Sequence, residues 1–352
     1  MRLSRRTAIG LVGGGLLTLA GVRFALPRTR GSDQILDIDV EATPIETLAR
    51  DRSGDRPAGP LVFRAGLKLT SAYAGFGGLS GLWRSPEGGE LIAISDNAQW
   101  LTASVLIING RLAGLGGARM GPVLDEDGSS LRHGRAYDTE ALALFEGTAF
   151  VASERTHEVR RFAWGESGMR ARGVPLSMPP EVKDLPGNRS LEAVGVAPRA
   201  HALAGAVIAI AEQARLGDDA PTRGWILTGP TTGPFDVARR DGYDITDIAF
   251  LDSGESLLLE RRYSVASGPA CRIRRLEADA IRPGALADGP VLFEADDSFE
   301  IDNMEGIAIH RDPASGETIV TLVSDDNFSP LQRTLLLEFS LAGNPQHAGG
   351  GP

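Results

Sequence analysis

The stretch NMEGIAI (303–309) recurs in altered form along the chain, and this recurrence decides the fold. The other copies are GGLSGLW (77–83), DTEALAL (138–144), SLEAVGV (190–196) and ITDIAFL (245–251). All five share a small or acidic residue, an apolar residue and then glycine or alanine. Each copy is followed by a turn and a second apolar strand, such as ELIAIS (90–95) or TIVTLVS (318–324). The repeated unit therefore contains several short strands, and no long helical pattern stands out within it.

The repeated unit is about 56 residues long. Its key polar positions are Ser80, Glu140, Glu192, Asp247 and Glu305, which are 60, 52, 55 and 58 residues apart. A repeat of this length with several strands is typical of a β-propeller, in which the first strand of each blade lines a central tunnel. Residues 60–340 have room for five such repeats. We therefore predict an all-β fold, a single propeller with five blades.

The two ends of the chain are expected to close the ring. The strand FRAGLKL (63–69) would complete the last blade beside TLLLEFSL (334–341). A sixth blade stays open as an alternative, because LDIDVEATPI (36–45) offers further strands. A β-sandwich would explain the strands but not the repeat. The predicted organisation is a signal and linker (1–30), an N-terminal arm (31–59), the propeller (60–345) and a flexible tail (346–352).

The first residues of the chain resemble an export signal. Arg5 and Arg6 precede an apolar, glycine-rich run over residues 8–20, as in twin-arginine signals. This run is too short to span a bilayer, which needs about 20 helical residues. We expect export of the folded chain to the periplasm or the medium, with no integral membrane span after the signal. The alternative is a basic N-terminus on a cytosolic protein.

Composition narrows the possible partners. The 352 residues carry a formal net charge of −10, with 42% hydrophobic residues. An acidic globular chain repels phosphate backbones, so we expect no nucleic-acid partner and a monomer that acts on a small molecule. Cys271 is the only cysteine, which excludes an internal disulfide and leaves it as a plain strand residue. No histidine pair has zinc-site spacing.

Acidic residues recur at two places in each repeat. One set is the repeated polar position, and the other follows the second strand in SDN (95–97), SER (153–155), AEQ (211–213), LER (259–261) and SDDN (324–327). Like charges confined together raise one another's pKa values unless something neutralises them. Ca²⁺, which prefers oxygen ligands, or Arg155, Arg261 and Arg262 could do so. Alternatively, the repeated acids only bind backbone N–H groups of the neighbouring blade.

Two weaker features lie outside this pattern. The loop DEDGSS (125–130) has acids at alternate positions, as calcium loops do, but Ala136 stands where the bidentate glutamate would be. We interpret it as a solvated loop. His157 follows one of the strand-end clusters, in SERTH, and is the one histidine placed near the predicted site.

In its repeated segments the sequence resembles the bacterial phytase-like family, also described by an "esterase-like activity of phytase". The resemblance covers residues 60–341 and is most specific in DNMEGIAI (302–309) and SDDNFSPLQRTLLL (324–337). It implies an exported β-propeller with a phosphoesterase-type site. Carried over, it points to Glu140, Glu154, Glu192, Glu260, Arg261, Asp302, Glu305, Asp325, Asp326 and Asn327. Ser80 and Asp247 depart from the pattern of glutamates, and the chain has few lysines to bind phosphates.

From the residues and the resemblance together we expect a Ca²⁺-assisted hydrolase of phosphoesters or other esters. The predicted metal ligands are Glu140, Glu192, Asp302, Glu305, Asp325 and Asp326. Glu154 and Glu260 are the predicted bases, and Arg155 and Arg261 the predicted phosphate-binding residues. The alternative is a non-catalytic envelope propeller that binds a ligand or a protein at its rim.

Overall fold

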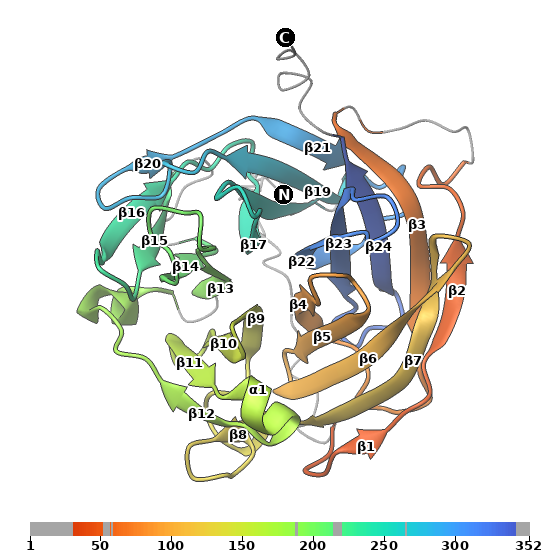
Figure 1. Ribbon diagram of the computed structural model, residues 1–352, viewed down its shortest axis with the longest axis horizontal. Coiled ribbons are helices and arrows are strands. Elements are labelled where there is room, and N and C mark those ends of the chain that lie inside the picture. The colour runs from red at the N-terminus through yellow and green to blue at the C-terminus, as the bar shows by residue number, and fades with distance from the viewer. Residues whose placement is uncertain are drawn as a thin grey trace, which may run out of the picture.

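The strands form five sheets arranged as blades around a central axis (Figure 1). The computed structural model describes residues 31–51, 57, 59–186, 189–213, 220–264 and 266–342. The predicted five-bladed all-β propeller is therefore confirmed. The predicted signal and linker (1–30) and the whole predicted tail (346–352) lie outside the described residues.

Each blade begins with its innermost strand and proceeds outward. Blade 1 contains β4 (Leu79–Arg84), β5 (Glu90–Ser95), β6 (Gln99–Ile108), β7 (Arg111–Pro122) and β1 (Leu36–Asp37). Blade 2 contains β9 (Thr139–Phe145), β10 (Thr148–Ser153), β11 (Glu158–Phe162), β12 (Arg172–Pro175) and β8 (Leu124–Asp125). Blade 3 contains β13 (Leu191–Val196), β14 (Val207–Ala211), β15 (Thr222–Ile226), β16 (Gly233–Val237) and β20 (Leu286–Ala287).

The last two blades follow the same plan. Blade 4 contains β17 (Asp244–Phe250), β18 (Ser256–Ser264), β19 (Gly268–Leu276) and β21 (Val291–Ala295). Blade 5 contains β22 (Asn303–Arg311), β23 (Thr318–Asp325), β24 (Thr334–Leu341), β3 (Leu61–Thr70) and β2 (Glu41–Ile45). The described helices are the single turns α1 (Trp164–Ser167), η1 (Leu131–His133), η2 (Gly168–Arg170) and η3 (Pro180–Asp184).

Blade 5 joins the two ends of the propeller. Strand β3 pairs antiparallel with β24, as expected, with Leu67 opposite Leu336. The segment proposed for a sixth blade is instead divided between two existing blades. Its first part, β1, pairs with β7 at the outer edge of blade 1, and its second part, β2, pairs with β3 at the outer edge of blade 5. Two short strands have too few backbone groups to form a sheet of their own.

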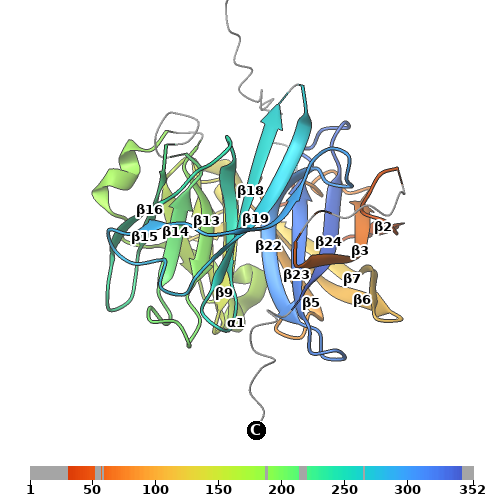
Figure 2. The same ribbon diagram turned by 90° about the horizontal axis from the view of Figure 1, so that it is seen from above.

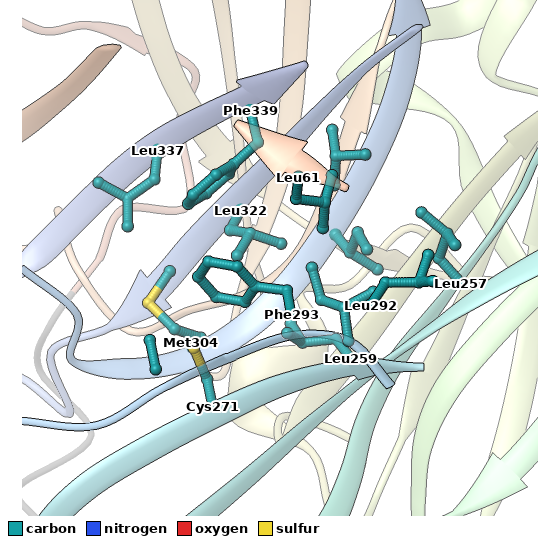
Figure 3. Packing of buried hydrophobic residues seen from close by; sticks show 14 of the residues in the cluster. Leu61, Leu257, Leu259, Cys271, Leu292, Phe293, Met304, Leu322, Leu337 and Phe339 are labelled. Atoms are coloured by element: carbon teal, nitrogen blue, oxygen red, sulfur yellow. The ribbon is translucent and has the colours of Figure 1, made fainter. Parts of the chain in front are cut away.

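Five apolar clusters lie between successive blades and hold the ring together. Between blades 4 and 5, Phe293 packs edge-on against Phe339 at 4.9 Å between ring centroids, with Met304 and Cys271 beside them (Figure 3). Both faces of a middle strand are buried in this way, which explains the continuous apolar runs in the sequence. Burial raises the pKa of the Cys271 thiol to about 12, consistent with a packing role.

Every inner strand carries a β-bulge at the same place, and the bulges define the repeat. The residues that lack a pairing partner there are Ser80, Glu140, Glu192, Thr246 and Glu305. In blade 4 the bulge residue is Thr246. The prediction that Asp247 occupies the repeated polar position is therefore wrong by one residue. The positions after the bulge are Gly81, Ala141, Ala193, Asp247 and Gly306. Four of these five are small.

Small residues follow the bulge because neighbouring blades approach closely there. A Cβ atom on Gly306 would lie 3.1 Å from the backbone nitrogen of Leu82 in blade 1. Asp247, the larger residue at this position in blade 4, forms hydrogen bonds across the close contact. Its carboxylate accepts the N–H of Ile248 at 2.8 Å and that of Ile307 in blade 5 at 2.9 Å. Asp247 therefore fastens blade 4 to blade 5, as the structural alternative for the repeated acids expected.

Candidate functional site

Three positions from each blade gather at one rim of the tunnel. The first position lies two residues before the bulge of the inner strand, and the second is the bulge residue itself. The third lies at or just after the end of the second strand in blades 1, 2, 3 and 5, and within β18 in blade 4. The first-position residues are Gly78, Asp138, Ser190, Asp244 and Asn303; the third-position residues are Asp96, Glu154, Glu212, Arg261 and Asp325. The backbone fixes this arrangement: the N–H of Glu154 donates to the Asp138 carbonyl, and that of Glu212 to the Ser190 carbonyl, both at 2.8 Å. We call these residues the rim site.

Four carboxylates of the rim site form a buried group, the acid cluster: Asp138, Glu140, Glu154 and Glu192. Asp138, Glu140 and Glu154 each place one oxygen within 4.8 Å of the others. Glu140 lies in β9, Asp138 directly before β9 and Glu154 directly after β10, so blade 2 supplies all three. The four side chains are almost completely buried, with Glu154 and Glu192 each 1% exposed. Burying several like charges costs much free energy unless a cation balances them.

Glu192 enters the acid cluster from blade 3. Its pKa is raised well above 4.5, mainly by burial and further by the negative charges of Glu140, Glu212, Glu154 and Glu305. Its Oε1 atom is buried and has no hydrogen-bond partner among the described residues. A buried carboxylate oxygen of this kind is an acceptor that the fold leaves available to a ligand.

Arg261 balances the acids on the opposite side of the tunnel. Its guanidinium contacts Glu212 and Glu305, each at 3.0 Å. It also donates to the side-chain oxygen of Asn303 at 2.7 Å, and the Asn303 amide donates to Glu305 at 2.8 Å. The rim site therefore has one half in which an arginine balances two acids, and another half in which four acids meet.

Arg155 borders the acid cluster from the solvent side. Its Nε donates to Asp138 at 2.9 Å, and its guanidinium lies 4.7 Å from the centre of the Tyr137 ring. The Arg155 side chain is 50% exposed. It is thus the charged group of this turn that a soluble anion can reach.

Glu260 lies away from the rim site. Its carboxylate contacts Arg272 and Arg274, each at 2.6 Å, and its side chain is fully buried within blade 4. Successive strand residues point to opposite faces, so Arg261 reaches the tunnel while Glu260 points into the blade. The structure therefore does not bring this predicted base together with Glu154.

The remaining predicted ligands hold loops and blades in place. Asp302 accepts the backbone N–H groups of Asn303 and Arg333 at 3.0 and 3.2 Å. Asp326 accepts the N–H of Gly78 at 2.9 Å and so joins blade 5 to blade 1. Asp325 belongs to the rim site and accepts the N–H of Asn327 at 2.6 Å. Of the predicted ligands, Glu140 and Glu192 are the two in the acid cluster, and Glu305 faces Arg261.

One hairpin extends beyond this rim. Strand β18 continues past Arg261 to Ser264, and in the side view β18 and β19 project above the neighbouring blades (Figure 2). Tyr263 lies on this projection and is 71% exposed. The projecting hairpin therefore stands beside the face on which the rim site opens.

A family model described as phytase-like, "esterase-like activity of phytase", matches residues 74–328. The chain belongs to the phytase-like family. The matched residues include the whole rim site, from Gly78 to Asp325. A comparison with curated proteins finds no match. None of the helices among the described residues has the length and hydropathy needed to cross a membrane.

Solved structures resemble this phytase-like protein only distantly. A protein of unknown function from Dyadobacter fermentans is 13% identical, with a TM-score of 0.41, over 89% of this chain and 96% of that one. An oxidoreductase (glucose dehydrogenase) of Thermus thermophilus is 14% identical, with a TM-score of 0.35, over 84% and 100%. A nidogen/laminin complex gives 10% identity and a TM-score of 0.34, over 74% and 87%. Similarities at this level do not identify a function.

The acid cluster of this phytase-like protein fits a hard cation. Its donors are all carboxylate oxygens, which suit Ca²⁺ rather than softer metals. The unpartnered Glu192 oxygen points to the same conclusion. The loop at 125–130 fits less well, because Asp125 is bound to Arg160 at 2.6 Å and Asp127 accepts from the Ser129 hydroxyl at 2.6 Å.

Asp138 lies in the acid cluster but is not among the site residues predicted from the sequence. The signal was available, since Asp138 opens DTEALAL just as Asn303 opens NMEGIAI. Both residues occupy the first position of the rim site, and both contact an arginine, Arg155 and Arg261 respectively. A polar residue two positions before the bulge therefore marks the site as clearly as the bulge residue does.

The raised pKa of Glu192 makes stability depend on pH. Between its usual pKa of 4.5 and its higher value in the fold, the native state binds the proton more tightly than the unfolded chain. Without added cations, we expect the melting temperature to fall as pH rises through this window. The melting temperature of the Glu192→Gln variant should fall less steeply with pH. At neutral pH without calcium it should be higher than that of the unaltered protein. Melting curves of both proteins in EDTA from pH 4.5 to 8 test this, and equal slopes would contradict it.

Proposed function

We propose that this phytase-like protein is an exported, Ca²⁺-assisted phosphoesterase. The observation that carries the proposal is the acid cluster: Asp138, Glu140 and Glu154 place carboxylate oxygens within 4.8 Å of one another, and Glu192, whose charge interacts with those of Glu140 and Glu154, has a buried oxygen without a hydrogen-bond partner among the described residues. Such a cluster is costly to fold unless it binds a cation. A bound hard cation is also the group that activates water and phosphoryl oxygens in hydrolases.

Asp138, Glu140 and Glu154 would hold the ion, and Glu192 lies beside them. When bound, Ca²⁺ would polarise a phosphoryl oxygen and lower the pKa of a coordinated water. The three ligands come from two adjacent segments of one blade, which fixes their mutual positions through the backbone hydrogen bond from Glu154 to Asp138. A preformed site of this kind loses little conformational entropy when the ion binds.

The other groups of the rim site would bind substrate and move a proton. Arg155, half exposed beside Asp138, would bind the phosphate of the substrate with its guanidinium. Glu192 would accept the proton of the attacking water on its unpartnered oxygen. Arg261 keeps Glu212 and Glu305 paired, so the negative charge of the opposite half does not repel the substrate.

Hydrolysis assays test the proposal directly. Purified protein is offered a phosphomonoester and a phosphodiester, each with Ca²⁺ and with EDTA, and we expect turnover that requires Ca²⁺. Calcium binding without turnover on either substrate would contradict catalysis. It would favour the alternative function, a non-catalytic propeller in which the ion holds the blades and the rim binds a partner.

Export is the second part of the proposal. It rests on Arg5 and Arg6 before the apolar run at residues 8–20, since these residues lie outside the described structure. A twin-arginine signal exports folded proteins and would place the protein in the periplasm or the medium.

A further inference from the structure

A histidine and a serine that the proposed mechanism does not use meet at the edge of the acid cluster. The Nδ1 atom of His157 lies 2.6 Å from the hydroxyl oxygen of Ser190. His157 belongs to the turn that follows Glu154, where its N–H donates to the Glu154 carbonyl at 3.2 Å. Its φ of 53° is uncommon for a residue with a side chain, and it directs the ring from blade 2 across to blade 3.

Ser190 occupies the first position of the rim site in blade 3, as Asp138 does in blade 2. Its carbonyl accepts the N–H of Glu212, and Glu192 follows two residues later. Ser190 is 0% exposed, whereas His157 is partly exposed. A fully buried hydroxyl cannot reach a substrate as a nucleophile, but it can fix the orientation of the ring that it contacts.

The turn over residues 154–157 therefore borders the acid cluster on two sides. At one side Arg155 contacts Asp138 at 2.9 Å, and at the other His157 contacts Ser190 at 2.6 Å. Glu154 lies between them in the cluster. A phosphoester that binds Arg155 above the acid cluster would have the His157 ring at its other side.

We propose that His157 is a further catalytic residue, which donates a hydrogen bond from Nε2 to the leaving-group oxygen of the phosphoester, with Ser190 as the positioning residue. The Ser190 hydroxyl donates to Nδ1 and thereby keeps the ring proton on Nε2. As the ester P–O bond breaks, its electron pair moves to the leaving oxygen, and this hydrogen bond stabilises the developing charge. The new P–O bond forms to water, whose proton goes to Glu192, and the departing oxygen takes a proton from solvent to leave as the alcohol.

A neutral ring is the form that this role needs. Burial lowers the pKa of His157 below 6.5, which favours the neutral imidazole at neutral pH. The inference rests on the proposed phosphoesterase function. It adds a substrate preference to that function. The hydrogen bond should accelerate hydrolysis most for esters with a poor leaving group, because these develop the most negative charge on the leaving oxygen.

Leaving-group dependence tests the role of His157. The substrates are an alkyl phosphate, with a poor leaving group, and nitrophenyl phosphate, with a good one. We expect His157→Asn, which keeps a polar group near Nδ1 for Ser190 but has no donor at the Nε2 position, to lower kcat for the alkyl ester about 10²–10³-fold, and for the nitrophenyl ester less than about tenfold. Ser190→Ala should lower kcat for the alkyl ester about tenfold. His133→Asn, a change of an exposed histidine that contacts Asp33, is the matched control and should behave as the unaltered protein does.

Three results would overturn the inference. Equal losses on both substrates would show that His157 only shapes the blade interface, and so would no loss on either. The melting temperature with saturating Ca²⁺ and the conservative variant His157→Gln, which keeps an amide N–H donor near the position of Nε2 and should retain part of the activity, separate misfolding from lost catalysis. Absence of turnover by the unaltered protein would overturn both this inference and the proposed function, whereas turnover with equal losses would overturn this inference alone.

Discussion

Replacing Glu140 with glutamine is expected to weaken Ca²⁺ binding at least about 100-fold and to lower kcat/KM by at least a similar factor. Changes to residues that only support a metal ligand already cost 10–100-fold, and Glu140 is a ligand in our proposal. The variant removes one negative charge from the acid cluster and keeps the shape of the side chain. At Ca²⁺ concentrations far above the dissociation constant, the calcium-linked stabilisation should fall by about 2.7 kcal/mol.

The matched control for Glu140→Gln is Glu126→Gln, in the exposed loop at 125–130, whose alternating acids resemble those of calcium loops. Calcium titrations of activity and of melting temperature compare the two variants. We expect the control to keep the calcium dependence of the unaltered protein. If Glu126→Gln weakens the response and Glu140→Gln does not, the ion lies in the loop at 125–130 and the assignment of the acid cluster is wrong.

Replacing Glu260 with glutamine should lower the free energy of unfolding by about 3–5 kcal/mol. We do not expect it to remove a catalytic base. Its carboxylate is the shared partner of Arg272 and Arg274, whose side chains are 1% and 0% exposed. A neutral amide would leave two guanidinium groups buried with too little negative charge. The folded fraction should hydrolyse substrate at the same rate, because Glu260 points into blade 4.

Denaturant unfolding at neutral pH measures this effect. The control is Glu255→Gln, which breaks the partly exposed pair with Arg275 and should cost less than about 1 kcal/mol. A stable Glu260→Gln variant with lost turnover would contradict the structural role and restore Glu260 as a catalytic residue.

The fold was predictable because the propeller repeats itself. Each blade buries its second strand between two neighbours, so the same apolar pattern recurs about every 56 residues, and the count of repeats gives the count of blades. The roles of residues 36–45 were not predictable in this way. Two-residue and five-residue edge strands carry no repeat signal, and the sheet to which they add is decided by long-range pairing.

In blade 4 the sequence pattern misplaces the site residues by one position, and this shift decides which side chain faces the tunnel. SER (153–155) and LER (259–261) look alike, yet strand pairing aligns Glu154 with Arg261 and not with Glu260. A shift of one position in a strand turns a side chain to the other face. The same shift separates Thr246 from Asp247. Register is set by the bulges, which a single sequence does not display.

Calcium titration of the unaltered protein, followed by calorimetry and by melting temperature, tests the central claim most directly. We expect one Ca²⁺ per chain, a rise in melting temperature that saturates with the ion, and its reversal by EDTA. These results would agree with the acid cluster as a cation site. No heat of binding and no change in melting temperature at millimolar Ca²⁺ would contradict that assignment, and with it the proposed mechanism.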